Sequence, residues 1–239
     1  MLTEERKTEL YDNYNRVLER VEAARARRGG DKPVTLLAAS KTRPAEEICY
    51  LAEKCGLALC GENHAQEFTE KYDAVASCGM KMDFIGHLQT NKVKYVVGRA
   101  RLIHSLDSVK LAEELNRRAA AMGVVQDVLI EINIGEEDSK TGLMPSEARD
   151  FLASLDAFES LRVRGMMTMA PKCEEISEIR KYFKESSRIF LDFFAKKTHN
   201  IGEAVLSMGM SDSFETAIEE GADIVRVGSA IFGARNYSR

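Results

Sequence analysis

The sequence predicts one α/β domain over residues 1–239, a closed (β/α)8 TIM barrel with an extra helix at the N-terminus. Short apolar stretches alternate with amphipathic stretches eight times along the 239 residues, and this alternation is typical of a parallel sheet covered by helices. The usual size of such a barrel, about 250 residues, accounts for nearly the whole chain. No Gly-x-Gly-x-x-Gly motif follows the first strand, which makes an open doubly wound sheet the weaker alternative.

The first expected element is the extra helix. Thr3 precedes two glutamates, as at a helix start, and apolar residues then recur at helical spacing. Arginines precede Gly29 at the other end, where cations stabilise the negative end of the helix dipole. These arginines could form a nucleic-acid patch, but a solvated last helical turn explains them more simply.

Eight strands follow, each a short run of apolar and β-branched residues. They are expected at 34–40, 57–61, 82–86, 101–105, 127–134, 161–169, 204–208 and 223–227. The intervening helices are expected at 44–55, 63–77, 91–97, 107–122 with Asp107 as N-cap, from about 145, 174–196, 213–220 and around 231–232.

Composition excludes several classes of function. A net charge of −4 gives no overall attraction to nucleic acid or to anionic lipid. The polar N-terminus is not a signal peptide, and no apolar run approaches the roughly 18 residues of a membrane helix, so we expect a cytoplasmic protein. The cysteines show no metal-ligand spacing and are expected to be free thiols: Cys49, Cys55, Cys60, Cys78 and Cys173.

A single lysine, Lys41, stands where the first strand should end. In a parallel barrel the carboxyl ends of the strands open on the active-site face. A lysine taken from water there needs a binding partner, so Lys41 is the candidate reactive group. It could also be a solvated residue that merely ends the strand.

The loops after the seventh and eighth strands predict a phosphate site. They contain Gly209-Met210-Ser211 and Gly228-Ser229-Ala230, whose small residues let backbone N–H groups approach an anion, and the hydroxyls of Ser211 and Ser229 add donors. Tight turns and helix caps would use the same residue types.

Arg226 lies inside the apolar eighth strand, where a buried guanidinium stays charged and needs an acceptor. A structural ion pair and a heteroaromatic ring nitrogen are both possible partners. A lysine amine, a phosphate cradle and an arginine facing a ring nitrogen together describe a pyridoxal phosphate site. Desolvation and the charge of Arg226 should lower the pKa of the Lys41 amine.

Within the fourth strand, His104 is expected to be a hydrogen-bonded core residue, and His87 lies in a loop at the mouth.

Several ordered motifs resemble one known family. They are 39–42 (ASKT), 61–63 (GEN), 84–89 (FIGHLQ), 165–168 (GMMT), 206–212 (LSMGMSD) and 225–233 (VRVGSAIFG). The chain closely resembles the pyridoxal phosphate homeostasis proteins from about residue 5 to 235, and the fold of that family is similar to the N-terminal barrel of alanine racemase.

The resemblance implies a role for each candidate residue. Lys41 would carry pyridoxal 5'-phosphate as a Schiff base, and Arg226 would face the pyridine nitrogen. Met210, Ser211, Gly228 and Ser229 would hold the phosphate, and Asn63 would be a pocket neighbour. Ser229 stands where many relatives have threonine, and both residues offer a hydroxyl.

The family is regarded as a carrier or regulator of the vitamin B6 pool. The resemblance therefore implies a non-catalytic, monomeric cofactor-binding protein, with apo-forms of B6-dependent enzymes as one class of partner and with no metal, nucleic acid or membrane. An amino-acid racemase is the main alternative, but the second, β-rich domain of alanine racemase is not expected in this sequence. An arginine at the ring nitrogen also weakens the ring as an electron sink. A Schiff-base aldolase would need neither the paired phosphate loops nor Arg226.

Overall fold

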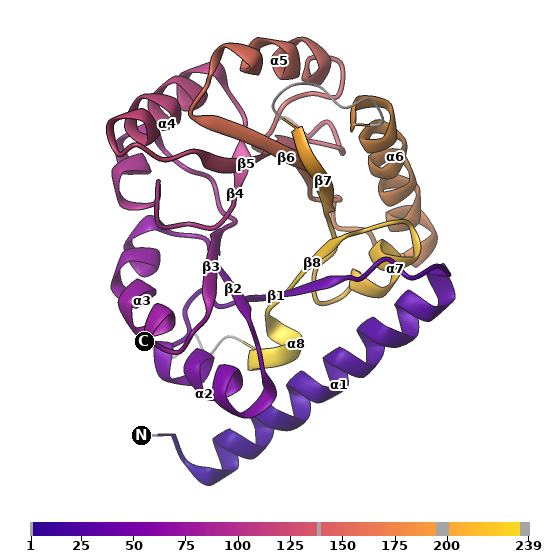
Figure 1. The fold of residues 1–239 in the computed structure, drawn as a ribbon. Coiled ribbons are helices and arrows are strands. Elements are labelled where there is room, and N and C mark those ends of the chain that lie inside the picture. Colours follow the sequence, from indigo (N-terminus) through magenta and orange to yellow (C-terminus); the bar gives the residue numbers. More distant parts are fainter. Residues whose placement is uncertain (1, 138–139, 195–200, 235–239) are drawn as a thin grey trace.

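The structure is a computed structural model that describes residues 2–137, 140–194 and 201–234. Its eight strands form one closed barrel in which β1 to β8 follow in chain order and every neighbouring pair is parallel (Figure 1). The predicted TIM barrel is therefore confirmed. Closure pairs the first strand with the last, so that Leu37 of β1 lies opposite Arg226 of β8.

The strands lie close to their predicted positions. They are β1 (Thr35–Ala39), β2 (Leu59–Glu62), β3 (Lys81–Phe84), β4 (Ile103–Leu106), β5 (Gln126–Ile132), β6 (Leu161–Thr168), β7 (Ile201–Ser207) and β8 (Ile224–Val227).

Helices connect the strands on the outside of the barrel (Figure 1). They are α1 (Glu4–Arg28), α2 (Ala45–Cys55), α3 (Ala65–Ser77), α4 (Val109–Ala121), α5 (Ala148–Ser154), α6 (Ile176–Phe194), α7 (Phe214–Glu219) and α8 (Ser229–Phe232), with short 3-10 helices η1 (Thr90–Tyr95) and η2 (Leu155–Ala157).

Two boundary predictions need correction. The expected helix at 91–97 is the tighter 3-10 helix η1. The N-cap of α4 is Ser108 rather than Asp107, because the Ser108 hydroxyl accepts a hydrogen bond from the Leu111 N–H. The last predicted residues of the helix at 174–196 lie outside the described residues.

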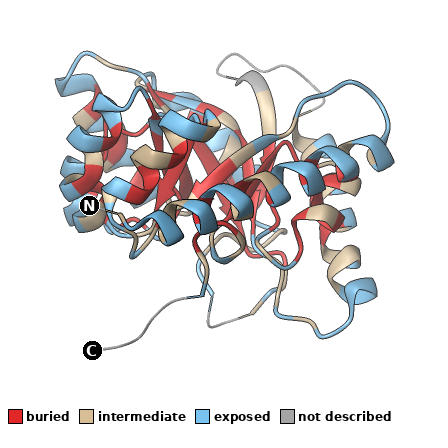
Figure 2. Cartoon of the chain, turned by 90° about the horizontal axis from the view of Figure 1, so that it is seen from below, coloured by how far each residue is buried: buried red, intermediate tan, exposed pale blue. Residues whose placement is uncertain are grey.

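The apolar core has two parts, which the alternation of side chains places on opposite faces of the strands. Figure 2 shows the strands buried and the outer faces of the helices exposed. The larger cluster joins strands to helices and includes Ala38 and Val225. The smaller cluster uses the alternate positions and therefore fills the barrel interior: Leu37, Leu59, Ile85, Leu102, Leu129, Met167 and Ile224.

The extra N-terminal helix α1 packs along the outside of the barrel against α2, α7 and α8 (Figure 1). Its apolar face is buried, including Leu10 and Val17. Two of its side chains bind the backbone of α8: Arg6 Nη2 donates to the Phe232 carbonyl at 2.9 Å, and Asn13 Nδ2 donates to the Ile231 carbonyl at 3.2 Å. The helix that begins the chain thus supports the helix that ends the barrel.

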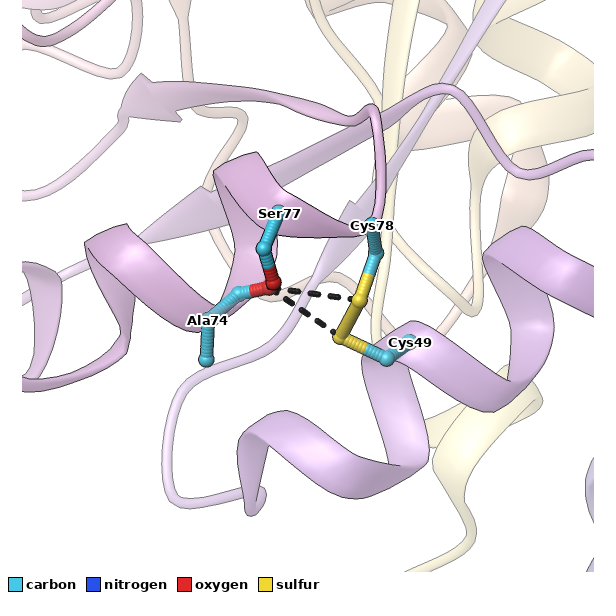
Figure 3. The surroundings of a disulfide bond; sticks show 4 residues. All are labelled: Cys49, Ala74, Ser77 and Cys78. Atoms are coloured by element: carbon cyan, nitrogen blue, oxygen red, sulfur yellow. Dashed lines mark hydrogen bonds between the residues drawn. A yellow bond between two sulfur atoms is a disulfide. The ribbon is translucent and has the colours of Figure 1, made fainter.

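The prediction of five free thiols is wrong for one pair, because Cys49 and Cys78 form a disulfide (Figure 3). Cys49 lies in α2 and Cys78 follows α3, with 5.6 Å between their Cα atoms. The two cysteines are 29 positions apart in the sequence, so no local spacing indicates the bond. The contact exists because α2 and α3 are neighbours on the barrel surface. The other three cysteines are free thiols.

Candidate functional site

One cavity of about 280 Å³ opens where β1, β7 and β8 end. Six of the seven predicted site residues line it: Lys41, Met210, Ser211, Arg226, Gly228 and Ser229. Barrel closure explains the arrangement, since the pairing of β1 with β8 brings the first strand end beside the last. The seventh residue, Asn63, lines a neighbouring pocket instead.

Lys41 lies in a tight turn directly after β1 and is half-buried. The turn is closed by a hydrogen bond of 3.0 Å from the Arg43 N–H to the Ser40 carbonyl. Thr42 has a φ of 64°, a left-handed conformation that is rare for a β-branched residue. The backbone that presents Lys41 to the cavity is therefore held in an unusual shape.

Arg226 is 5% exposed and projects from β8 into the same cavity. Its Nη1 donates to Ser207 Oγ at 2.7 Å, and its Nη2 donates to the Thr168 carbonyl at 2.9 Å. Burial lowers the pKa of the guanidinium to about 10, while the Glu131 charge acts in the opposite direction. Arg226 therefore stays charged at neutral pH. Its two bonds use two of the five N–H donors of a guanidinium and fix its plane.

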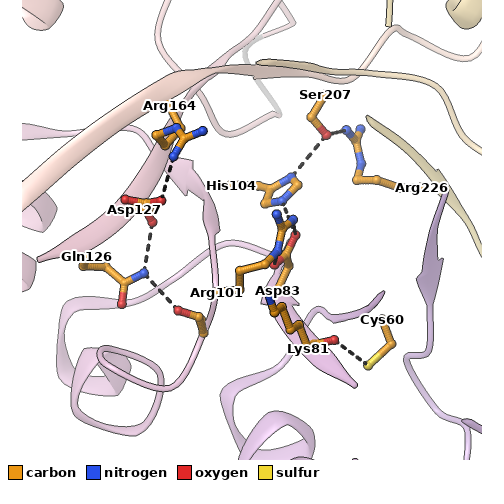
Figure 4. A network of polar contacts seen from close by, with 11 residues as sticks. Cys60, Lys81, Asp83, Arg101, His104, Gln126, Asp127, Arg164, Ser207 and Arg226 are labelled. Atoms are coloured by element: carbon orange, nitrogen blue, oxygen red, sulfur yellow. Dashed lines mark hydrogen bonds and ion pairs between the residues drawn. The ribbon is translucent and has the colours of Figure 1, made fainter. Parts of the chain in front are cut away.

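A chain of polar side chains, buried except for Arg101 at its far end, lies behind Arg226 (Figure 4). Ser207 Oγ lies 3.1 Å from His104 Nδ1, and His104 Nε2 lies 3.0 Å from Asp83 Oδ2. Arg101 closes the chain with two bonds of 2.8 and 2.5 Å to the Asp83 carboxylate. The arginines can only donate, which leaves the Ser207 hydroxyl to donate to Nδ1 and the His104 Nε2–H to donate to Asp83.

The predicted core role of His104 is confirmed, because its ring is fully buried and both nitrogens have partners. The ring also makes stability depend on pH. Burial lowers the pKa of His104, although the Asp83 carboxylate acts in the opposite direction. The unfolded chain has a histidine pKa of about 6.5, so it takes up a proton more readily than the folded chain does.

We therefore expect His104 to destabilise the folded state as the pH falls below about 6.5, whereas the raised pKa values of the buried Glu62 and Glu131 act in the opposite direction. The contribution of one histidine is at most about 1.4 kcal/mol per pH unit. Urea unfolding between about pH 7 and about pH 5 measures it. The unfolding free energy of His104→Gln should depend less steeply on pH than that of the wild type. Equal slopes would show that another group is responsible.

The loops after β7 and β8 meet at one oxygen atom. Ser211 Oγ accepts hydrogen bonds from the Gly228 N–H at 3.1 Å and from the Ala230 N–H at 3.3 Å. A Cβ on residue 228 would lie 3.0 Å from the Ala39 carbonyl oxygen, so a side chain would crowd the end of β1. This corner of the cavity already binds an oxygen through backbone N–H groups, as a phosphate site requires.

The sequence analysis missed two further cations that line the cavity, Arg43 and Lys172. With Lys41 and Arg226 they give four cationic side chains among the described residues that line it, against one carboxylate from Asp212. Arg43 could have been noticed, since it lies two positions after Lys41. Lys172 belongs to the loop after β6, and no local pattern marks it. Their charges favour a dianionic ligand.

Asn63 lies next to the cavity that the other candidate cofactor-binding residues line, not in it. Its pocket has a volume of about 500 Å³ and is formed by the loops after β2 and β3. Within the described parts of the chain, Asn63 Oδ1 is buried without a hydrogen-bond partner. His87 lines the same pocket, with its Nδ1 3.4 Å from Asp107 Oδ2. The prediction for Asn63 as a pocket neighbour stays a prediction.

Two kinds of feature are absent from the described residues. The ranges 2–137, 140–194 and 201–234 contain no group of three or more His, Cys, Asp or Glu residues placed to hold a metal ion. None of the helices in these ranges combines the length and apolar character that crossing a membrane requires.

Known proteins similar in sequence and in structure cover most of the chain. Residues 13–236 match the family described as "Alanine racemase, N-terminal domain". A protein of Aquifex aeolicus (strain VF5) named "Pyridoxal phosphate homeostasis protein" is 43% identical over 227 residues, which cover 95% of this chain and 98% of the relative. A crystal structure of "an unknown protein from Bifidobacterium adolescentis" superposes with a TM-score of 0.87 at 34% identity, covering 97% of this chain and 98% of the other. PipY of Synechococcus elongatus PCC7942, solved with PLP bound, has a TM-score of 0.77 at 29% identity, with 90% of this chain and 99% of that chain covered.

Proposed function

Since the chain belongs to the pyridoxal phosphate homeostasis proteins, within the alanine racemase N-terminal domain family, we propose that it binds pyridoxal 5'-phosphate and takes part in vitamin B6 homeostasis without a dedicated catalytic reaction. One observation carries the proposal. A lysine amine, a buried arginine and an oxygen-binding corner surround a single cavity.

Each side of the cavity suits a different part of the cofactor. Lys41 would bind the aldehyde carbon through its amine as a Schiff base. Arg226 would donate to the ring nitrogen, because its plane is fixed by Ser207 and Thr168. Ser211 and Ser229 would donate hydroxyl hydrogens to the phosphate. When bound, the cofactor supplies an electrophilic aldehyde and an aromatic electron sink.

Two features support a carrier over an amino-acid racemase. The described residues that line the cavity include no tyrosine, the second base that a two-base racemase of the alanine racemase kind uses. A charged Arg226 at the ring nitrogen would keep that nitrogen unprotonated, which weakens the ring as an electron sink.

The working unit that we propose is a monomer in the cytoplasm that delivers the cofactor to apo-forms of B6-dependent enzymes.

The test is an absorbance titration of cofactor-stripped protein with pyridoxal phosphate. We expect a yellow complex, with one cofactor per chain at saturation. A colourless protein that takes up no cofactor would refute the proposal. The same preparation should racemise amino acids negligibly, and turnover at ordinary enzymatic rates would favour the racemase.

A further inference from the structure

The turn that carries Lys41 has a backbone conformation that is unfavourable for one of its residues, Thr42. Its closing bond joins the Ser40 carbonyl to the Arg43 N–H, and its third residue, Thr42, has a φ of 64°. These are the features of a type II turn, in which glycine is the usual third residue. A threonine there costs conformational energy that the surroundings must offset.

A buried ion cluster meets the turn from α3. Lys71 is 9% exposed, and its Nζ donates to the Ser40 carbonyl at 3.0 Å, to Glu62 Oε1 at 2.9 Å and to Glu67 Oε2 at 2.9 Å. Glu67 Oε2 also accepts the backbone N–H of Thr42 at 2.6 Å. The cluster therefore binds one backbone group on each side of the lysine in the turn.

The Glu67 carboxylate has the charge that strengthens its hydrogen bond to the Thr42 N–H. Burial alone would raise the pKa of Glu67, but hydrogen bonds from Lys71 and from the Thr42 N–H bring it below its usual value. The carboxylate therefore stays ionised at neutral pH, and a charged acceptor makes a stronger bond to a backbone N–H than a neutral one does.

The bond to Thr42 distinguishes the two common turn types. Type I and type II turns differ mainly in a flip of the central peptide, here the peptide between Lys41 and Thr42. A carboxylate that accepts the Thr42 N–H stabilises the orientation seen here over the flipped one. Both turn types have the same φ at the second residue, here Lys41, so the flip reverses the peptide and not the Lys41 Cα–Cβ bond. What the cluster fixes is the backbone on both sides of Lys41, and with it the point from which the side chain enters the cavity.

We propose that Glu67 and Lys71 are positioning residues. They stabilise the left-handed backbone at Thr42 and so hold the turn where the Lys41 side chain enters the cavity. The idea rests on the proposed function in one respect, the role of Lys41 as the cofactor-binding amine.

The first test is Glu67→Ala, with Glu70→Ala as the matched control. Glu70 lies one turn further along α3 and contacts Gln66 at the surface. We expect Glu67→Ala to weaken pyridoxal phosphate binding roughly 5- to 30-fold, the factor that corresponds to losing the support of one strained residue. Glu70→Ala should bind as the wild type does. Glu67→Gln, which keeps the shape and an acceptor oxygen, should be affected less.

The decisive variant is the double substitution Thr42→Gly with Glu67→Ala. Glycine adopts a positive φ freely, so it should restore most of the binding lost in Glu67→Ala. Because a glycine at a positive φ also relieves strain in the folded chain, urea unfolding of each variant is measured beside the titration to show that all of them are folded under the conditions of the binding assay.

A second readout needs no cofactor. The rate at which a small amine-selective reagent labels Lys41, followed by mass spectrometry, should change in Glu67→Ala and return toward the wild-type rate in the double variant. Normal cofactor binding and labelling in Glu67→Ala would overturn the positioning role. Failure of the wild type to bind cofactor, with the labelling pattern as expected, would refute the proposed function and leave the positioning role standing.

Discussion

Lys41→Ala is expected to abolish the borohydride-stable attachment of pyridoxal phosphate. Borohydride reduces the bond between a lysine amine and the cofactor aldehyde to a permanent one, which adds the mass of a pyridoxyl group to the chain. Lys41 lies in the turn after β1 and lines the cavity. Without this amine, the cofactor could be held only by non-covalent contacts. Intact mass and peptide mapping after reduction measure the attachment.

The cavity offers its own control in Lys172, a second amine on the lining. Lys172→Ala should keep the full reduced adduct on Lys41, because its proposed contribution is charge alone. An adduct of unchanged stoichiometry in Lys41→Ala, mapped to Lys172 or elsewhere, would show that the wrong lysine was chosen.

Arg226→Ala is expected to weaken cofactor binding by roughly 10- to 150-fold, the loss of a hydrogen bond to a charged group worth about 1.5–3 kcal/mol. The same change leaves the Ser207 hydroxyl and the Thr168 carbonyl without their buried donor. Thr42→Ala should alter binding about twofold or less, since the Thr42 side chain is exposed and its N–H remains. Equilibrium titrations of the three proteins measure the difference.

Two serine variants distinguish a specific effect on Arg226 from a general loss of barrel stability. Ser207→Ala removes one of the two acceptors of the Arg226 guanidinium. Ser105 is equally buried, and within the described residues its hydroxyl has no partner. Ser207→Ala should weaken binding and change the absorbance of the bound cofactor, while Ser105→Ala should do neither. Equal losses in Arg226→Ala and Thr42→Ala would remove the assigned role of Arg226.

The barrel could be predicted because its signals are local and repeated. Each strand is a short apolar run, and each is followed by a helix with one apolar face. The barrel also predicts which strands meet, so Lys41 and Arg226 could be placed on one rim despite their distance in the sequence. The same reasoning could not find the cap of α4, because Asp107 and Ser108 are both good caps and only the bond to Leu111 distinguishes them.

Features that depend on side chains meeting across the fold were not predictable. The disulfide joins Cys49 to Cys78 because two helices happen to be neighbours. Lys172 reaches the cavity from a loop with no motif. The chain behind Arg226 joins residues of three strands with Arg101, which precedes β4. His104 could be assigned to the core, but not to its partners. Glycine was absent from the turn at Thr42, so the left-handed backbone there had no sequence signal.

The contacts between α1 and α8 matter for how the protein is handled. Arg6 and Asn13 bind carbonyls only two or three residues beyond Ser229, so the amino-terminal segment braces the proposed anion corner from behind. We expect deletion of that segment, or fusion of a bulky partner in front of Thr3, to disturb a ligand site more than 200 positions away in the sequence. An expression tag is therefore better placed where it leaves the start of the chain untouched.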